Sequence, residues 1–228
     1  MIKKTLKFVT SFLIACILLL TVLGFLQYRQ VIKTESIENK ITNIQNNLNY
    51  VPINHISTHL INATIAIEDK RFYEHGGIDL FGLIRAARDS INAGGIVGGG
   101  STITQQLAKN MYFSHEPSLI RKIAEMFVAF DLERNYEKDT ILECYLNIIN
   151  YGDNYFGIKE ASEGYYHNMP SKLTLDQAST LAGIPQSPSN LQLSNESEYT
   201  KLKQKAVLEA MVREDMIPQI LVDEIISK

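Results

Sequence analysis

Cysteine is scarce in this chain of 228 residues, which contains only two. Cys16 lies inside an apolar run and Cys144 stands alone in the remainder, so no intramolecular disulfide framework is expected. The five histidines are scattered without the spacing of metal ligands, which argues against a histidine metal centre. Sustained strand alternation and internal repeats are also missing. Their absence excludes sheet and solenoid architectures and leaves a helical one.

Most of the chain also lacks an excess of positive charge. Residues 1–34 hold five basic and no acidic side chains, so residues 35–228 carry 17 Lys and Arg against 25 Asp and Glu. A nucleic-acid-binding domain needs a basic surface. The acidic body therefore predicts that nucleic acid is not a partner.

An uncharged run of 19 residues, 8–26, stands near the N-terminus. Its length is about the minimum needed to cross a hydrocarbon core of roughly 30 Å. Three lysines precede the run and two basic residues follow it, a bias that favours a cytoplasmic N-terminus and an exported body. We therefore expect a single-pass protein of the cell membrane with an extracytoplasmic domain.

Two other interpretations of the run fit the sequence less well. A cleaved signal peptide needs a small-x-small site, which does not follow here. The stretch from Leu13 to Cys16 resembles a lipoprotein signal, but ten further uncharged residues follow the cysteine. The expected division is a cytoplasmic tail at 1–7, a transmembrane anchor at 8–26, a polar stalk at 27–50 and one domain at 51–228.

Apolar residues recur at helical spacing through almost all of that domain, which predicts an all-α fold. Ser57, Asp79, Ser101, Ser118 and Thr174 are placed to begin helices. For the helix after Asp79, the spacing predicts a buried face, and a flexible break is expected at 94–100. Further helices are expected at 138–147, 199–214 and 218–227. The buried face after Asp79 consists of Leu83, Ile84, Ala87 and Ile91.

The helix expected to begin at Ser101 has an unusual polar face. Thr102, Gln105, Gln106 and Lys109 lie at i, i+3, i+4 and i+7 and share one side of it. Ile103, Leu107 and Met111 lie opposite and are expected in the core. The preceding glycines and the helix N-terminus expose backbone N–H groups, which suit an anion. A nucleotide P-loop is excluded because serine, not lysine, follows the last glycine. A solvated polar face is the open alternative.

Two further stretches carry candidate chemistry. Glu68 ends an apolar helix, where partial desolvation would raise its proton affinity as a general base requires. The alternative is a solvated helix end, and His75 nearby is expected to be structural. Arg121 and Glu125 are i, i+4 neighbours, which fits either a surface ion pair or an anion site with a carboxylate that shares a divalent cation.

Together these stretches resemble motifs of the family 51 glycosyltransferases, the peptidoglycan glycosyltransferases, over about residues 50–215. The first three motifs are Glu68-Asp69-x-x-Phe72-x-x-His75-x-Gly77, Gly99-x-Ser101-Thr102-Ile103-Thr104-Gln105-Gln106 and Arg121-Lys122-x-x-Glu125. Later matches are Ile141-Leu142-Glu143-Cys144-Tyr145-Leu146-Asn147, Leu181-Ala182-Gly183-Ile184-Pro185-Gln186-Ser187-Pro188 and Val207-Leu208-Glu209-Ala210-Met211.

The resemblance implies a lysozyme-like, all-α lobe with a smaller lobe that contacts the membrane. It implies polymerisation of lipid II into β-1,4-linked glycan strands, with inversion at the anomeric carbon. The implied partners are lipid II, the nascent glycan strand, the membrane and other proteins of cell-wall synthesis. A divalent cation, Mg²⁺ or Mn²⁺, is implied as a cofactor, with Glu125 as its ligand.

The resemblance also assigns roles to residues. Glu68 is the expected base, and Glu125 is the second carboxylate, near the diphosphate. The expected substrate-binding residues are Ser101, Thr102, Gln105, Gln106, Lys109, Arg121 and Lys122. Those expected to brace the site are Asp69, Phe72, His75, Tyr145 and Asn147.

Some positions depart from the family pattern. Pro117 stands where many relatives carry an arginine, so one cation of the leaving-group site is missing. Lys203 replaces the usual arginine of the last motif and keeps the charge. No Ser-x-x-Lys occurs, so a monofunctional transferase without transpeptidase activity is expected; a shortened form of a two-domain enzyme is the open alternative. The competing hypotheses are a non-catalytic lipid II-binding scaffold protein of the cell wall and a lysozyme-like hydrolase that uses Glu68 as its acid.

Overall fold

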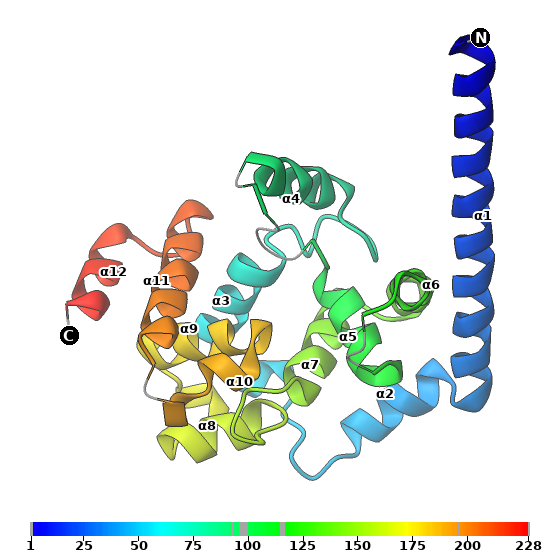
Figure 1. The fold of residues 1–228 in the computed structure, drawn as a ribbon. Helices are drawn as coiled ribbons and strands as arrows, with labels where there is room; N and C mark the ends of the chain where they lie inside the picture. Colours follow the sequence, from blue (N-terminus) through cyan, green and yellow to red (C-terminus); the bar gives the residue numbers. More distant parts are fainter. Residues whose placement is uncertain (1, 93, 96–99, 115–116, 196, 228) are drawn as a thin grey trace.

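A computed structural model describes the chain except for residues 1, 93, 96–99, 115–116, 196 and 228. The described residues form helices and no strand, which confirms the predicted all-α class (Figure 1). The α-helices are α1 (Ile2–Thr34), α2 (Ile37–Gln45), α3 (Thr58–Glu68), α4 (Leu80–Asn92), α5 (Ile103–Tyr112), α6 (Leu119–Asn135), α7 (Lys138–Ile148), α8 (Ile158–Tyr166), α9 (Leu175–Gly183), α10 (Pro188–Leu191), α11 (Glu198–Arg213) and α12 (Gln219–Ile226). Short 3₁₀ turns are η1 (Ile53–His55), η2 (Pro170–Lys172), η3 (Ile184–Gln186) and η4 (Leu193–Asn195).

Most helices begin where the sequence predicts. The Ser118 and Thr174 side chains cap α6 and α9, and the Asp79 carboxylate accepts a hydrogen bond from Gly82 N at the start of α4. Helix α5 is an exception, because its cap is Thr102 and its first residue is Ile103, not Ser101. The predicted break at 94–100 lies mostly outside the described residues.

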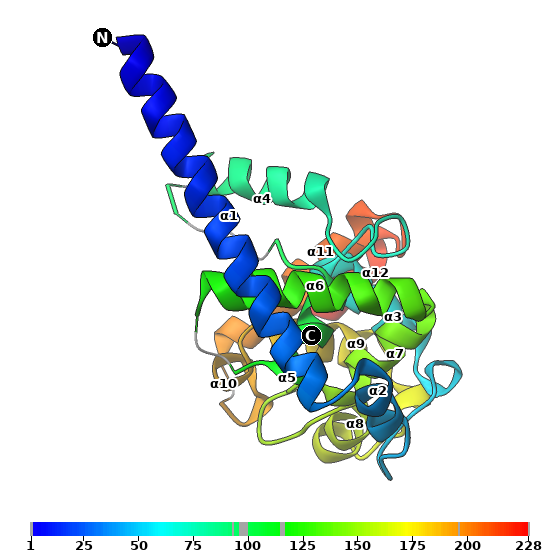
Figure 2. The ribbon, with the colours of Figure 1, turned by 90° about the vertical axis from the view of Figure 1, so that its right-hand side faces the viewer.

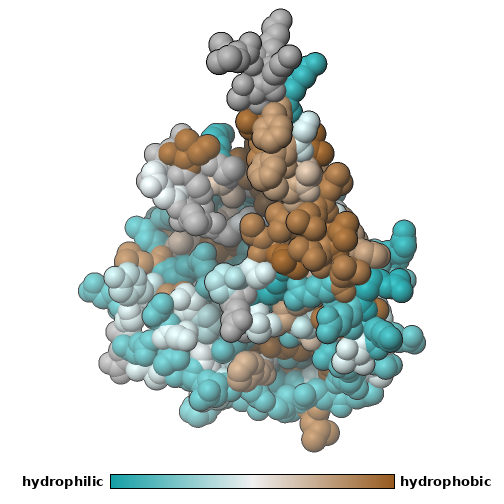
Figure 3. Space-filling view, turned by 45° about the vertical axis from the view of Figure 1, so that its right-hand side comes forward, coloured by the Kyte–Doolittle hydropathy of each residue, from teal (hydrophilic) through white to brown (hydrophobic). Residues whose placement is uncertain are grey.

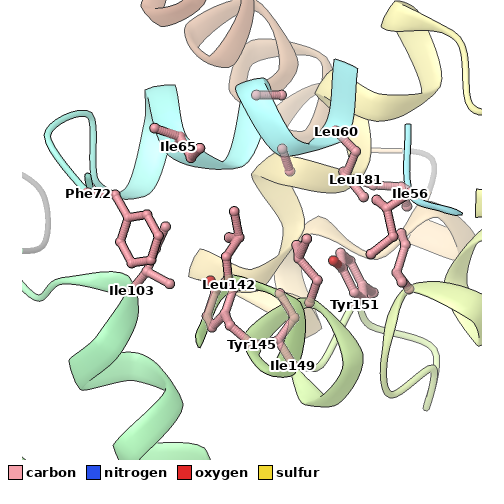
Figure 4. Close-up of a cluster of buried hydrophobic side chains, with 14 of the residues drawn as sticks. Ile56, Leu60, Ile65, Phe72, Ile103, Leu142, Tyr145, Ile149, Tyr151 and Leu181 are labelled. Carbon is pink, nitrogen blue, oxygen red and sulfur yellow. The ribbon is translucent and has the colours of Figure 1, made fainter. Parts of the chain in front are cut away.

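The core lies where α3, α5, α7, α9 and α11 meet. Leu60 and Ile65 of α3 face Leu142 and Tyr145 of α7 across this space, and Ile103 closes it from α5 (Figure 4). All five are buried. The predicted apolar side of α5, Ile103, Leu107 and Met111, is also buried, which leaves the polar side of that helix for a cleft.

Helix α1 extends well beyond the rest of the molecule and crosses α6 near its own C-terminal end (Figures 1 and 2). In the part of the chain that the structure describes, it is the one helix long and apolar enough to cross a membrane. Its exposed side chains form a continuous apolar surface (Figure 3). The Phe25, Tyr28 and Phe127 rings contact one another, and Tyr28 donates a hydrogen bond to Asp131.

The segment predicted as a stalk, 27–50, is folded against its surroundings. Residues 27–34 continue α1 without a break, and α2 follows. Ile37 and Ile41 of α2 are buried in the core cluster, and the Asn49 amide donates to Glu160 over 2.8 Å. The apolar spacing of α2 therefore buries one side of a segment whose composition is mostly polar.

Helix α4 contradicts one prediction. Ile84 and Ile91, expected in a buried face, are 68% and 80% exposed, and Leu83 is also exposed. Phe81 adds to this apolar surface and is also exposed, although the Arg71 guanidinium lies 4.8 Å from the centre of its ring. Helix α4 lies apart from the core, on the side toward which α1 extends (Figure 1). Its periodicity correctly predicts an amphipathic helix but does not identify what its apolar side contacts.

Candidate active site

Glu68 is the last residue of α3 and reaches toward α5. Its Oε2 accepts a hydrogen bond of 2.6 Å from the Gln106 amide. Burial raises the pKa of the Glu68 carboxyl, an effect that the Gln106 hydrogen bond and the positive charge of Lys203 partly offset. The carboxylate thus has an increased affinity for a proton and a fixed orientation, as a general base requires.

Gln106 is itself held on its other side. The Tyr145 hydroxyl donates to Gln106 Oε1 over 3.2 Å, which leaves the amide nitrogen to face Glu68. Tyr145 is fully buried in α7, and burial raises its pKa well above the usual range. The hydroxyl is therefore protonated and acts as a fixed donor. The sequence predicted a bracing role for Tyr145, and the contact specifies which group it orients.

A cleft of about 440 Å³ opens beside Glu68 and brings most of the predicted residues together. Helices α3, α5, α6 and the 3₁₀ turn η3 form its walls. The lining residues are Ile67, Glu68, Ser101, Gln105, Gln106, Lys109, Arg121, Lys122, Glu125, Pro185 and Gln186.

Glu125 is a buried carboxylate of this cleft that contacts two cationic side chains, Arg121 and Lys122. Its side chain is 1% exposed, and its two oxygens lie 3.0 Å from Arg121 Nε and 3.1 Å from Lys122 Nζ. Arg121 Nε and Glu125 Oε1 are close enough for an ion pair but are not aligned for a hydrogen bond. Both atoms therefore retain hydrogen-bonding capacity. Lys122 also donates to the Ser101 hydroxyl over 2.6 Å. The carboxylate therefore holds two cations in place at the cleft wall.

Lys109 projects from α5 into the same cleft. Burial lowers the pKa of its ammonium group; Glu125 opposes this effect, and Arg121 and Lys122 add to it. Three cationic side chains and one carboxylate therefore share the wall, with a net positive charge. Such a wall suits an anion that carries more than one negative charge.

Two predicted binding residues have structural contacts that their predicted roles did not include. Thr102 is buried, donates its hydroxyl to the Gly77 carbonyl over 2.9 Å, and does not line the cleft. Gln105 lines the cleft, but its Oε1 accepts from Thr102 N in a reciprocal capping box. Both residues fix the start of α5 and so the direction of Gln106 and Lys109.

The remaining predicted bracing residues lie behind the cleft. Asp69 accepts from Ile103 N over 3.0 Å and lies 2.6 Å from His75 Nε2, which ties the end of α3 to the start of α5. Burial raises the pKa of the Asp69 carboxyl, and the His75 contact opposes this effect. Phe72 is fully buried between them and the core. Asn147 lies farther away and holds Val51 through hydrogen bonds of 2.7 and 2.9 Å.

One cluster has the composition of a cation site. Asp69, His75 and Asp79 each offer a ligand atom, and these atoms lie within 4.8 Å of one another. Asp79 also pairs with Arg71, and none of the three lines the cleft. The predicted metal ligand Glu125 is not part of this cluster. Because cations already face both of its oxygens, Glu125 alone does not form a preformed divalent site.

Local sequence patterns missed some of the residues around Glu68. Lys203 of α11 reaches Gln186 by a hydrogen bond, and its charge acts on Glu68. In the sequence, Lys203 is indicated only by its position in the last motif of the family resemblance. A second hollow of about 230 Å³ adjoins the cleft and shares Gln106, Lys109, Pro185 and Gln186 with it. The other residues of this hollow are Asn110, Ile149, Asn150, Pro188 and Ser189.

Comparison with known proteins gives consistent results. Residues 35–212 match the family described as transglycosylase. The chain is 44% identical over 158 residues to penicillin-binding protein 1A of Neisseria cinerea, and 48% identical over 139 residues to penicillin-binding protein 1F of Bacillus subtilis (strain 168). It is 40% identical over 179 residues to penicillin-binding protein 1A of Aquifex aeolicus (strain VF5).

These alignments cover 69%, 61% and 78% of the chain and 20%, 20% and 25% of the respective relatives. The chain therefore corresponds to a minor part of the length of each relative. The matched region contains the whole cleft, from Ile67 to Gln186. By this match, the chain belongs to the transglycosylase family.

Proposed function

We propose that the chain is a peptidoglycan glycosyltransferase that polymerises lipid II. The observation that carries the proposal is the cleft, which joins one carboxylate of raised pKa, Glu68, to a cationic wall of Lys109, Arg121 and Lys122. A sugar transfer from a lipid diphosphate needs a base and a site for the departing anion. Both are present within one cleft of about 440 Å³.

In the proposed reaction, Glu68 takes the proton from the 4-hydroxyl of the acceptor sugar. The hydroxyl oxygen attacks the anomeric carbon of the donor chain, and the bond from that carbon to the diphosphate oxygen breaks. The lipid diphosphate leaves with the bonding electrons, and the three cations stabilise its growing charge. A single displacement inverts the anomeric centre and forms a β-1,4 linkage.

The membrane arrangement is a further part of the proposal. Helix α1 would span the membrane with its N-terminus in the cytoplasm, because the lysines precede the apolar run. The exposed apolar side of α4, formed by Phe81, Ile84 and Ile91, would enter the outer leaflet on the same side. The cleft would then open close to the lipid that carries the substrate.

A requirement for Mg²⁺ or Mn²⁺ is a separate part of the proposal. A cation at Glu125 would have to replace Lys122 or Arg121 as the partner of a carboxylate oxygen. We therefore assign no step to it. Polymerisation that survives EDTA would contradict a metal requirement and leave the role of the three cationic side chains intact.

The decisive experiment incubates the full chain in detergent with labelled lipid II and a divalent cation, and separates the glycan products by size. We expect polymer from the wild type and none from Glu68→Gln. Glu74→Gln is the matched control, because Glu74 is exposed and lies outside the cleft. No polymer from the wild type, or undiminished polymer from Glu68→Gln, contradicts the proposal. Lipid II binding without polymer would favour the scaffold hypothesis.

The same assay addresses Pro117, where many relatives have an arginine. Arg121 already extends toward this loop and donates to the Ser114 carbonyl over 2.6 Å. If the absence of a fourth cation limits departure of the diphosphate, Pro117→Arg raises turnover. Unchanged turnover would mean that Lys109, Arg121 and Lys122 suffice.

A further inference from the structure

A separate pocket of about 270 Å³ lies between α2, α5 and α7, outside the cleft that contains Glu68. We call it the amide pocket, because four of its nine lining residues are asparagines. Its lining residues are Lys40, Asn43, Ile44, Asn47, Tyr50, Asn110, Met111, Asn147 and Ile148.

The amide pocket is polar but nearly neutral. The Lys40 ammonium lies 2.8 Å from a Glu35 carboxylate oxygen, so its charge is balanced locally. The Asn43 and Asn110 amide nitrogens donate to Glu35 and to the Gln106 carbonyl over 2.9 and 2.8 Å, which leaves their carbonyl oxygens as acceptors. A neutral ligand rich in hydroxyl and amide groups matches this lining better than a charged one does.

The amide pocket continues the groove that starts at Glu68. Asn110 lines both this pocket and the hollow of about 230 Å³ beside the cleft, and that hollow shares Gln106 and Lys109 with the cleft. Helix α5 therefore borders all three spaces in succession. Helix α5 lies between α4 and α2, so the succession leads away from α4 and from the free end of α1 (Figure 1). A polymer that grows at Glu68 and leaves the membrane surface in that direction would pass the amide pocket.

We infer that the amide pocket binds an N-acetylated sugar residue of the glycan strand, beyond the two sugars that react. This inference rests on the proposed function. The volume of about 270 Å³, just below the roughly 300–1,000 Å³ typical of ligand sites, suits one sugar ring. The Asn43 and Asn110 carbonyls accept from sugar hydroxyls and acetamido N–H groups, and the Tyr50 ring offers an aromatic surface. An anionic stem peptide fits this pocket less well, because Lys40, the cation among the described lining side chains, is paired with Glu35.

The test blocks the pocket without touching the cleft. Asn43→Phe fills it from α2, and Asn43→Ala removes one amide. Asn39→Phe is the matched control, because Asn39 is exposed on the same helix and does not line the pocket. The three variants and the wild type are compared as full chains in detergent, with thermal unfolding as a check of folding.

Two readouts are used. The first is the length distribution of glycan made from lipid II, for which we expect shorter strands from Asn43→Phe and wild-type strands from Asn39→Phe. The second is saturation-transfer NMR with N-acetylchitotetraose as the probe, for which blocking one sugar contact is expected to cost about tenfold in affinity. Asn43→Ala is expected to give a smaller loss in both.

Unchanged strand length and unchanged probe binding in a folded Asn43→Phe variant would overturn the inference. Equal loss in Asn39→Phe would also overturn it, because the effect would then not belong to the pocket. If the wild type makes no polymer, the proposed function fails by itself. The probe measurement then still decides whether the pocket binds N-acetylated sugar.

Discussion

The contact between α1 and α6 depends on a glycine, and a single methyl group tests it. A Cβ atom at Gly24 would lie 2.5 and 2.7 Å from Ile123 Cγ2 and Cβ, and 3.2 Å from the Ile120 carbonyl oxygen. Separations below 3.0 Å require a shift, and because Ile123 Cβ is fixed to the backbone of α6, a change of the Ile123 rotamer alone does not relieve the contact. We therefore expect Gly24→Ala to separate α1 from α6 and to weaken the neighbouring contacts of Phe25 and Tyr28 with Phe127.

Two opposing free energies decide the size of this effect. Overpacking costs about 1–3 kcal/mol, whereas alanine favours a helix over glycine by about 0.8–1.0 kcal/mol. The net expectation is a loss of about 1 kcal/mol, with a range from about zero to 2 kcal/mol. For a chain of this size, 1 kcal/mol lowers Tm by about 2–4 °C. It also accelerates hydrogen exchange controlled by the local opening about fivefold.

Thermal unfolding in detergent and hydrogen exchange of peptides from α1 and α6 measure these changes. Gly95→Ala is the matched control, because an added Cβ there meets no atom within 4 Å. Gly24→Leu, which inserts more volume, is expected to give a larger loss. An unchanged or raised Tm in Gly24→Ala, with unchanged exchange in α6, would refute the reasoning.

Three further predictions concern Glu68 of the cleft and two residues that support it from outside, Lys203 and Thr102. Lys203→Met moves the acid limb of the pH–rate profile to higher pH, because the Lys203 charge lowers the pKa of Glu68. Initial rates measured against pH test this, and an acid limb that stays in place would contradict it. Glu68→Gln raises Tm near pH 7, because a carboxyl whose folded pKa is raised destabilises the fold once pH exceeds its unfolded pKa. The gain disappears below the ordinary glutamate range, and melting curves at both pH values check it. Thr102→Val lowers the free energy of unfolding by about 0.5–2 kcal/mol in urea titrations, through loss of the α5 cap; an unchanged midpoint would contradict it.

The sequence was a good guide to the helices and a weaker one to their surroundings. Spacing correctly predicted that Ile103, Leu107 and Met111 lie in the core, because apolar residues at helical spacing share one side of α5 and that side is buried. The start of α5 was misplaced by two residues, since Ser101 and Thr102 are both good caps. The exposed side of α4, including Ile84, could not be predicted, because periodicity does not specify the element that covers a face.

The candidate site shows the same limit. Motif order suggested that Glu68, Gln106 and Glu125 belong together, and all three line one cleft. The predicted roles included neither the commitment of Gln105 to a cap nor the effect of Lys203 of α11 on Glu68. The cap has a local signature, the Thr102-x-x-Gln105 spacing of a capping box, whereas the effect of Lys203 depends on packing between helices that are distant in sequence.

Helix α6 links the apolar helix α1 to the chemistry. One of its sides carries Ile123 and Phe127 against α1, and another carries Lys122 and Glu125 in the cleft. Both sides belong to one helix of 17 residues, so the depth of α1 in a membrane would set the height of the cationic wall. The diphosphate of a lipid substrate lies at the membrane surface, where its height is also fixed. A change at Gly24 should therefore weaken capture of a lipid-linked substrate, even though Gly24 does not line the cleft.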